Sequence, residues 1–203
     1  MKPTLTEVQK DGLTEVINIG VGRAAGYLNE MVGSKVDLKI PEIRILPPTD
    51  IGTETRFGES EEISCVYLDF FGGLIGKGVF ALPTEDAVKL SAALTGEAID
   101  SPELLSSLSD TLTETGNILV NGVMGSIVDL LEMRAEFAVP GFIKGRVVDV
   151  MKVFKVDAVD VVVFIKAEFN IRDHDIGGNI LLLFQMQSFE TLISEINRLY
   201  LEG

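Results

Sequence analysis

The chain repeats a polar motif at an offset of 99 residues, and this repeat limits its possible folds more than any other feature. Residues 11–18 read DGLTEVIN and residues 110–117 read DTLTETGN, so Asp, Leu, Thr, Glu and Asn recur in register. A proline follows each motif asparagine after 22 intervening residues, as Pro41 and Pro140. One four-residue match at fixed spacing has a chance on the order of 10⁻⁵ per position. A duplication that kept only core positions would explain the apolar matches but not the polar ones.

Helical periodicity places the polar residues of each copy on one face of a helix. Asp11, Glu15 and Asn18 stand at intervals of four and three residues, and Leu13, Val16 and Ile17 fall on the opposite side. The second polar stripe comprises Asp110, Glu114 and Asn117. Each motif is therefore predicted to be the solvent face of an amphipathic helix, which gives two equivalent surfaces.

The segments after the two motifs also correspond. We expect strands over 35–46, 134–139, 63–71, 74–82, 145–156, 159–171 and 179–185, with bends at 72–73 and 177–178. Helices are expected over 85–95, 101–109 and 189–201, the first and last capped by Thr84 and Ser188. The predicted fold is α/β (α+β), a pseudo-twofold, internally duplicated domain with a mostly antiparallel sheet and two long motif helices. Residues 1–203 form this single domain, from repeats of about 7–100 and 106–203.

Composition excludes several classes of partner. The formal charge of −14 argues against nucleic acid and anionic membranes, which need clustered Lys or Arg. No apolar run approaches the ~20 residues of a membrane span, and the N-terminal residues do not form a signal peptide. With one cysteine, Cys65, no internal disulfide can form. These observations predict a cytoplasmic protein without membrane insertion.

The polar stripe lacks an activated nucleophile. Thr14 and Thr113 have no His or Lys nearby in the sequence to activate them. An asparagine cannot act as a general base at neutral pH, but its amide can hold a water molecule. An acid one turn away can bind a Lys or Arg of a partner. This combination suits a helix that docks into another protein's active site and orients water towards a phosphoryl group.

The pattern [D/S]-x₃-E-x₂-N-x₂₂-P resembles the signature of the CheC/CheX/FliY phosphatases, and both copies match it completely. The resemblance covers nearly the whole chain, whose length and duplication are similar to those of CheC-type members. It implies hydrolysis of the phospho-aspartate of a CheY-type response regulator in chemotaxis. Asn18 and Asn117 would position the water, and Glu15 and Glu114 would pair with a lysine of the regulator. Asp11, Asp110, Pro41 and Pro140 complete the motif in a supporting role.

The resemblance also bears on cofactors and partners. No cofactor or metal of its own is expected, because the regulator would supply Mg²⁺. The phosphorylated regulator is the first partner, and CheD, a receptor deamidase that CheC proteins often bind, is the second. The alternative is a non-catalytic adaptor or scaffold that binds CheD or flagellar switch components. The switch protein FliM has a related middle domain but lacks the Glu/Asn motif.

Other signals favour structural interpretations. Residues 20–25, GVGRAA, resemble a dinucleotide fingerprint, but the second copy lacks the glycines, so close helix packing is the better account. His174 is expected in a polar hairpin loop rather than a metal or phosphorelay site, and Cys65 in the core. Acidic residues at 54, 59, 61 and 62 are expected in a solvated loop.

Overall fold

A computed structural model describes residues 5–33, 35–51, 57, 61–154, 160–171 and 174–201. The helices are α1 (Glu7–Val32), α3 (Thr84–Thr95), α4 (Pro102–Leu130), α5 (Val147–Val153) and α6 (Met186–Leu201), with a 3-10 turn η1 (Pro48–Asp50). The strands are β1 (Val36–Leu46), β2 (Glu62–Gly72), β3 (Gly76–Pro83), β4 (Ala135–Phe137), β5 (Gly141–Arg146), β6 (Val161–Ile171) and β7 (His174–Phe184). Of the predicted acidic loop, residues 54 and 59 lie outside the described part.

The described strands form one antiparallel sheet in the order β1-β6-β7-β3-β2-β4, with β5 also paired to β2. In the 99-residue repeat β1 corresponds to β4 and β5, β2 to β6, and β3 to β7. With this correspondence the strand order is the same from either edge of the sheet. The last strands of the two halves, β3 and β7, pair at the centre. The first strand of each half pairs with the second strand of the other half. The predicted pseudo-twofold, mostly antiparallel fold is therefore confirmed, and the two halves are interleaved.

The register of the sheet preserves the 99-residue repeat. Val36 of β1 pairs with Ile171 of β6, and Ala135 of β4 pairs with Gly72 of β2. Ala135 is 99 residues after Val36, and Ile171 is 99 residues after Gly72, so the two pairs are equivalent. The same relation holds at the other end, between Leu46↔Val162 and Gly145↔Ile63. Side-chain direction alternates along a strand, so a shift of one residue would turn each face over. The duplication has therefore kept the same residues facing the core.

The two motif prolines explain an irregularity common to both halves. Pro41 lies in β1, where the pairing with β6 shifts between Lys39 and Glu42. Pro140 lies in the break between β4 and β5, both of which pair with β2. Proline has no N–H to donate to a strand ladder, so it is tolerated at bulges and breaks. The spacing from motif asparagine to proline thus fixes where each first strand is interrupted.

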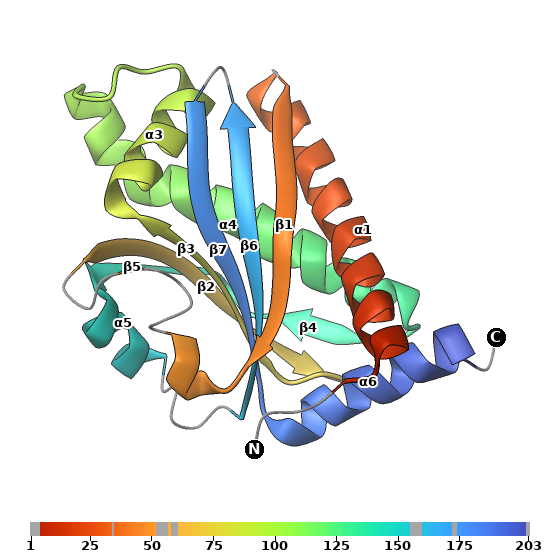
Figure 1. The fold of residues 1–203 in the computed structure, drawn as a ribbon. Helices are drawn as coiled ribbons and strands as arrows, with labels where there is room; N and C mark the ends of the chain where they lie inside the picture. The colour runs from red at the N-terminus through yellow and green to blue at the C-terminus, as the bar shows by residue number, and fades with distance from the viewer. Residues whose placement is uncertain are drawn as a thin grey trace.

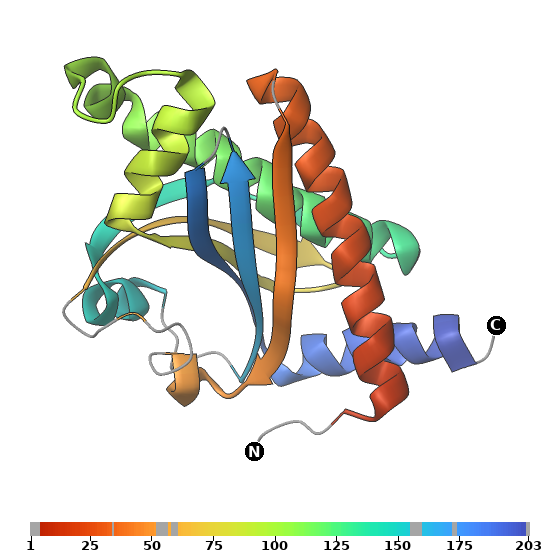
Figure 2. The ribbon, with the colours of Figure 1, turned by 45° about the horizontal axis from the view of Figure 1, so that its top comes forward.

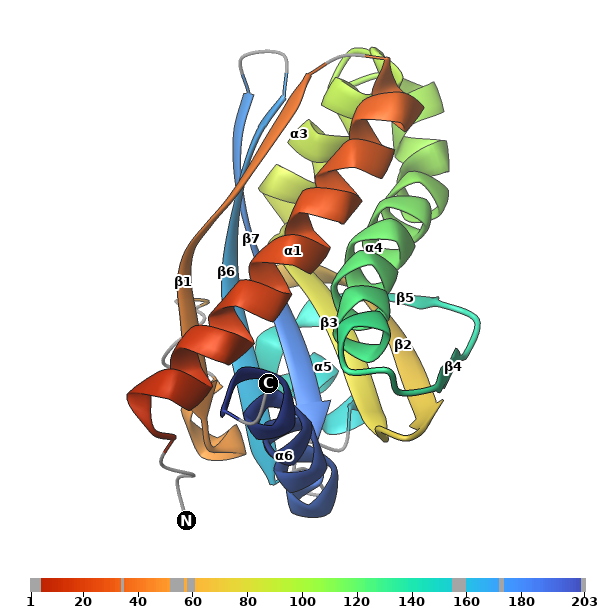
Figure 3. The same ribbon diagram turned by 90° about the vertical axis from the view of Figure 1, so that its right-hand side faces the viewer.

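Two apolar layers cover the two faces of the sheet (Figures 1, 2 and 3). Helices α1, α3, α4 and α6 contribute to the larger cluster, while α5 packs on the opposite face. β6 serves both layers by alternation, since Val161 and Val163 join the first cluster and Val162 and Phe164 join the second. The long helices α1 and α4 therefore have one buried side against the sheet and one side open to solvent.

One predicted strand is wrong in part: residues 147–153 form α5, and only the preceding residues belong to β5. The valine-rich run favoured a strand. However, Val147 and Val150 are buried three residues apart, a helical spacing, and Asp149 pairs with Arg146 and Lys152 at three-residue spacing. Burial against the second face of the sheet outweighs the intrinsic preference of valine.

The expected bend at 177–178 is also wrong. Gly177 and Gly178 lie inside β7, paired with Glu168 and Ala167. A Cβ on Gly178 would approach the Leu82 Cδ2 to 2.8 Å, so a glycine here allows close packing across the sheet rather than a turn. His174, expected in a loop, is the first residue of β7 and pairs with Ile171.

The helix boundaries differ from expectation at three points. The stretch 101–109 is the start of the continuous helix α4, not a separate helix. Thr84 is the first residue of α3, after the cap residue Pro83, and its hydroxyl donates to the Glu62 carbonyl. Helix α6 begins two residues before Ser188, whose hydroxyl accepts from the Ile75 N–H. Both predicted caps are therefore engaged in tertiary contacts instead.

Candidate functional site

The first motif lies in the first half of α1, a helix with a well-defined start. Thr6 caps it, because its hydroxyl accepts from the Gln9 N–H while the Gln9 side chain accepts from the Thr6 N–H. Gly33 ends the helix in the left-handed conformation, with φ of 63°. The motif residues therefore sit on a regular, fixed helix rather than on a loop, which favours a pre-formed surface.

The first polar stripe lies on the solvent side of α1, as the periodicity predicts. Asp11, Glu15 and Asn18 are all exposed. Together with Thr14 and Ile19 they line an open hollow of about 430 Å³. Within the described part of the chain, the Asn18 amide makes no hydrogen bond, so it is available to a water molecule or a partner.

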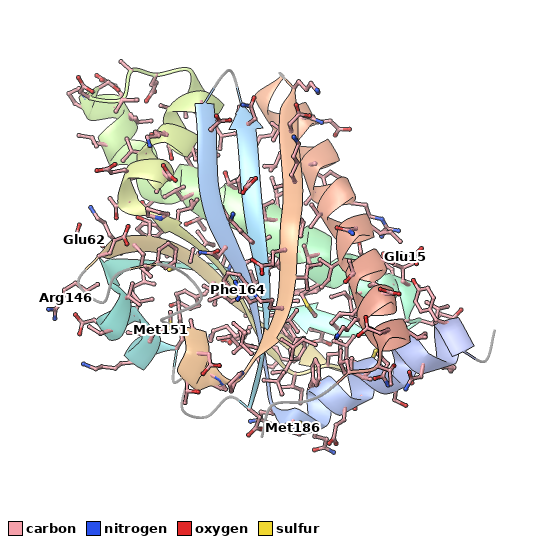
Figure 4. All side chains as sticks on the ribbon, in the orientation of Figure 1. Glu15, Glu62, Arg146, Met151, Phe164 and Met186 are labelled. Atoms are coloured by element: carbon pink, nitrogen blue, oxygen red, sulfur yellow. The ribbon has the colours of Figure 1, made fainter. Side chains whose placement is uncertain are left out.

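Helix α6 reaches this first stripe from the far end of the sequence. Figure 4 shows Glu15 at the outer edge of α1, near the C-terminal part of α6. Burial, followed by the negative charge of the nearby Glu15 carboxylate, raises the pKa of Tyr200. The half-buried ring lies over Gly12, where a Cβ would approach the Tyr200 Cδ2 to 3.1 Å. The absence of a side chain at Gly12 brings the tyrosine up to the site.

The second stripe lies on α4, which Ser101 caps by accepting from the Leu104 N–H. Asp110 and Glu114 are exposed, whereas Asn117 is half-buried. Asn121, one helical turn further on, donates a side-chain amide N–H to the side-chain Oδ1 of Asn117 at 2.7 Å. In the first copy, Gly22 stands at the place of Asn121 and offers no such bond. The two sites therefore share their motif but differ in how the asparagine is held.

The structure brings each set of three motif residues together but keeps the two sets apart. Helices α1 and α4 pack side by side, and their N-terminal ends lie at opposite ends of the helix layer (Figures 1 and 3). Each stripe is thus a separate polar surface. Pro41 lies in β1 and Pro140 in the break between β4 and β5, so both belong to the sheet rather than to the stripes. Two neighbours were missed: Asn121 could have been found at one turn from Asn117, but nothing in the sequence places Tyr200 beside Glu15.

Within the described residues, neither Thr14 nor Thr113 is hydrogen-bonded to a basic side chain that could activate it as a nucleophile. The Thr113 hydroxyl donates to the Ser109 carbonyl at 2.6 Å, and Thr14 is half-buried in the wall of the hollow. Among the described residues, no cluster of three or more His, Cys, Asp or Glu side chains is arranged to hold a metal ion. The groups that each stripe offers are one amide and two carboxylates. Such groups can position water and bind a cation of a partner.

The dinucleotide-like run and Cys65 are explained by packing in the core. Gly20, the first glycine of the dinucleotide-like run, faces α4, where a Cβ would meet the Val123 Cα at 2.7 Å. Close helix packing therefore accounts for Gly20, although Gly22 has open space around it. Cys65 is fully buried in β2, and burial raises the pKa of its thiol to about 12. In the part of the chain that the structure covers, no helix is both long and apolar enough to span a bilayer.

No family model matches this sequence. The fold is nevertheless shared with proteins of the CheC/CheX/FliY type. FliY of Thermotoga maritima matches with a TM-score of 0.73 at 16% identity, over 97% of this chain and 100% of that one. CheX in the CheX–CheY–BeF₃–Mg²⁺ complex of Borrelia burgdorferi matches with a TM-score of 0.54 at 17% identity, over 84% and 98%. The FliM middle domain of H. pylori matches with a TM-score of 0.62 at 14% identity, over 94% and 99%.

A curated relative shows the same likeness at the level of sequence. The chain is 27% identical over 139 residues to the CheY-P phosphatase CheC of Bacillus subtilis. The alignment covers 67% of this chain and 66% of the length of that CheC. The resemblance to the CheC/CheX/FliY proteins, predicted from the two motifs, is thereby confirmed.

Proposed function

We propose that this protein is a chemotaxis phosphatase that hydrolyses the phospho-aspartate of a CheY-type response regulator. The observation that carries the proposal is the pair of exposed helix faces, each with a glutamate and an asparagine one turn apart, on a CheC-type fold. Two similar proteins support a CheY-type partner. One is the sequence relative CheC, a CheY-P phosphatase, and the other is a protein of the same fold solved as a CheX–CheY complex.

In the proposed reaction each stripe inserts into the regulator's active site. The amide of Asn18 or Asn117 holds a water molecule in line with the phosphorus–oxygen bond. The water oxygen attacks phosphorus, the bond to the aspartyl oxygen breaks, and the regulator's carboxylate leaves. The proton lost by the water passes to the departing inorganic phosphate. Mg²⁺ held by the regulator neutralises charge on the phosphoryl oxygens, so this chain needs no cofactor of its own.

The carboxylates of the stripes provide recognition. Glu15 and Glu114 are exposed and can each pair with a lysine of the regulator. Asp11 and Asp110 lie one turn before them and support the docked helix through a further contact. Because the chemistry is positioning rather than nucleophilic attack by the protein, loss of the amide removes catalysis while loss of the carboxylate weakens docking. CheD binding and a cytoplasmic location complete the proposal.

The test is phosphate release from a CheY-type receiver protein phosphorylated with acetyl phosphate. Wild-type protein is expected to accelerate release at least tenfold, about 1.4 kcal/mol of barrier lowering, and the Asn18→Ala/Asn117→Ala double variant is expected to abolish the effect. The matched control is Asn29→Ala, which removes an amide from the far end of α1 outside the stripe. Equal rates for wild-type protein and the double variant would refute the proposal.

A scaffold without turnover is the second candidate function. The FliM middle domain has the same fold at a TM-score of 0.62, and other FliM structures of similar likeness are complexes with FliG and SpeE. Two intact motifs favour catalysis over this alternative. Capture of a CheY-type or switch protein without faster dephosphorylation would favour the scaffold.

A further inference from the structure

The asparagine of the second stripe is held by a neighbour on its own helix. Asn121 donates from its Nδ2 to the Oδ1 of Asn117 at 2.7 Å, and both side chains are half-buried. This distance is typical of a well-formed hydrogen bond. The bond prevents the Asn117 amide from turning over, because the turn would bring N–H groups of the two residues face to face. The Nδ2 end of Asn117 is therefore kept free.

The other end of the Asn121 amide is shut off from solvent. Within the described residues, its Oδ1 atom is buried and has no hydrogen-bond partner. A buried acceptor without a partner has lost its hydration and destabilises the fold, so an apolar side chain of similar size would be more favourable here. Asparagine is also a poorer helix former than leucine. Stability alone therefore does not account for Asn121, whereas its bond to Asn117 does.

The first stripe lacks this contact. Gly22 stands where Asn121 stands in the second copy, and a Cβ at Gly22 would have open space around it, so packing does not require the glycine. Within the described part of the chain, the exposed Asn18 amide makes no hydrogen bond. The terminal torsion of an asparagine is broad, so a free amide can turn whereas a bonded one is held. The two sites therefore carry the same amide in a free and a held state.

We propose, on the basis of the function proposed above, that Asn121 is a positioning residue of the second site. Its Nδ2 group holds the Asn117 amide in one orientation for the attacking water. A free amide must lose rotational freedom when the water and the phosphoryl group come into line, and the held amide has already lost it. Asn121 therefore acts on the chemical step rather than on docking, for which the exposed Asp110 and Glu114 remain available.

The experiment measures phosphate release by the full chain in the Asn18→Ala background, where only the second site operates. Asn121→Leu removes the bond to Asn117 and replaces the unpaired acceptor with an apolar side chain of similar size. The kcat should fall about three- to tenfold, the KM for the phosphorylated regulator should change less than about twofold, and the melting temperature should not fall. A lower rate without lower stability is a result that a merely structural role of Asn121 would not give.

Two controls separate positioning from general effects. In the Asn117→Ala background, where only the first site operates, Asn121→Leu should change neither kcat nor KM. In the Asn18→Ala background, Thr115→Val removes a different side-chain bond of α4, from the Thr115 hydroxyl to the Thr111 carbonyl, and should leave kcat unchanged. If the leucine lowers the melting temperature, Asn121→Ala is judged by the same kcat criterion. An unchanged kcat in the second-site protein, or an equal fall in both single-site proteins, would overturn the proposal.

A failure of the proposed function would look different. In that case neither single-site protein would accelerate phosphate release, whatever residue stands at position 121. The order parameters of the side-chain NH₂ groups, from ¹⁵N relaxation of the free protein, would then decide. A higher order parameter for Asn117 than for Asn18, which drops to the Asn18 value with Asn121→Leu, supports the positioning role. Equal values for Asn117 and Asn18 in the wild-type protein reject it.

Discussion

Gly20 of α1 lies directly against the backbone of Val123 in α4, where a Cβ on the glycine would stand 2.7 Å from the Val123 Cα. A second contact between the same helices is equally close, since a Cβ on Gly122 would meet the Ala24 Cβ at 2.6 Å. Ala24 and Val123 are 99 residues apart, so they are equivalent positions of the two copies. The helices therefore touch at the pseudo-twofold axis, and this contact sets how the two stripes face outward.

Gly20→Ala should destabilise the protein by about 1–3 kcal/mol, because the added methyl group must push the two helix backbones apart. Gly26→Ala on the same helix is the matched control, since Gly26 is exposed and has open space around its Cβ position. The control should stabilise the helix by about 0.5–1 kcal/mol. Urea unfolding measures both free energies. Similar values for the two variants would contradict the close helix contact.

Asn121→Gly should lower the activity of the second site about three- to tenfold. The bond from Asn121 fixes the Asn117 amide while leaving its N–H groups and one lone pair free for water. Removal of this bond makes the second site resemble the first, where Gly22 stands at the equivalent place. The rate of phosphate release in an Asn18→Ala background isolates the second site.

The control for this variant is Asn121→Gly in the Asn117→Ala background, where only the first site operates and the rate should not change. A glycine in a helix also costs about 1 kcal/mol of stability, so folding must be checked by circular dichroism at the assay temperature. A faster second site would mean that the Asn117–Asn121 bond restrains the amide from the water instead of preparing it.

The sequence could predict what depends on local pattern. Helical periodicity gives the outward stripes of α1 and α4, and the 99-residue repeat gives the pseudo-twofold sheet. The repeat also includes a proline, Pro41 or Pro140, at the point where the first strand of each half is interrupted. These features follow from residue spacing within a single element or between equivalent elements, so no knowledge of the packed molecule is needed.

The rest depends on tertiary contacts that no local pattern encodes. Valine-rich residues 147–153 form a helix because Val147 and Val150 pack against the second face of the sheet. Thr84 and Ser188 look like caps in sequence, but their hydroxyls bond to Glu62 and Ile75 from other elements. Tyr200 reaches the first stripe only because α6 crosses the start of α1. The roles of the motif residues themselves stay predictions until the variants are measured.

Cys65 should be inert in the folded protein. Its side chain is fully buried and burial raises the pKa of the thiol to about 12, so almost no thiolate exists near neutral pH. Reaction with an aromatic disulfide reagent at pH 8 should be at least about a hundredfold slower than in urea-unfolded protein. Iodoacetamide, a smaller reagent, provides the control for steric exclusion. Rapid labelling of native protein would show that β2 opens readily.

The raised pKa of Tyr200 should make stability depend on alkaline pH. Burial first, and then the negative charge of Glu15, raise the pKa of Tyr200, so the folded state holds the phenolic proton more tightly than the unfolded state. The contribution is therefore complete below the unfolded tyrosine value of about 10 and declines as the pH rises through the folded value. Unfolding in urea, measured from pH 8 to 11 in a Cys65→Ala background, should show the stability difference between Tyr200 and Tyr200→Phe proteins shrinking above pH 10. The Cys65→Ala change removes the buried thiol, which would also titrate in this range, and Glu15→Gln should weaken the trend by removing the negative charge. A constant difference across the range would mean that folding does not raise the pKa of Tyr200.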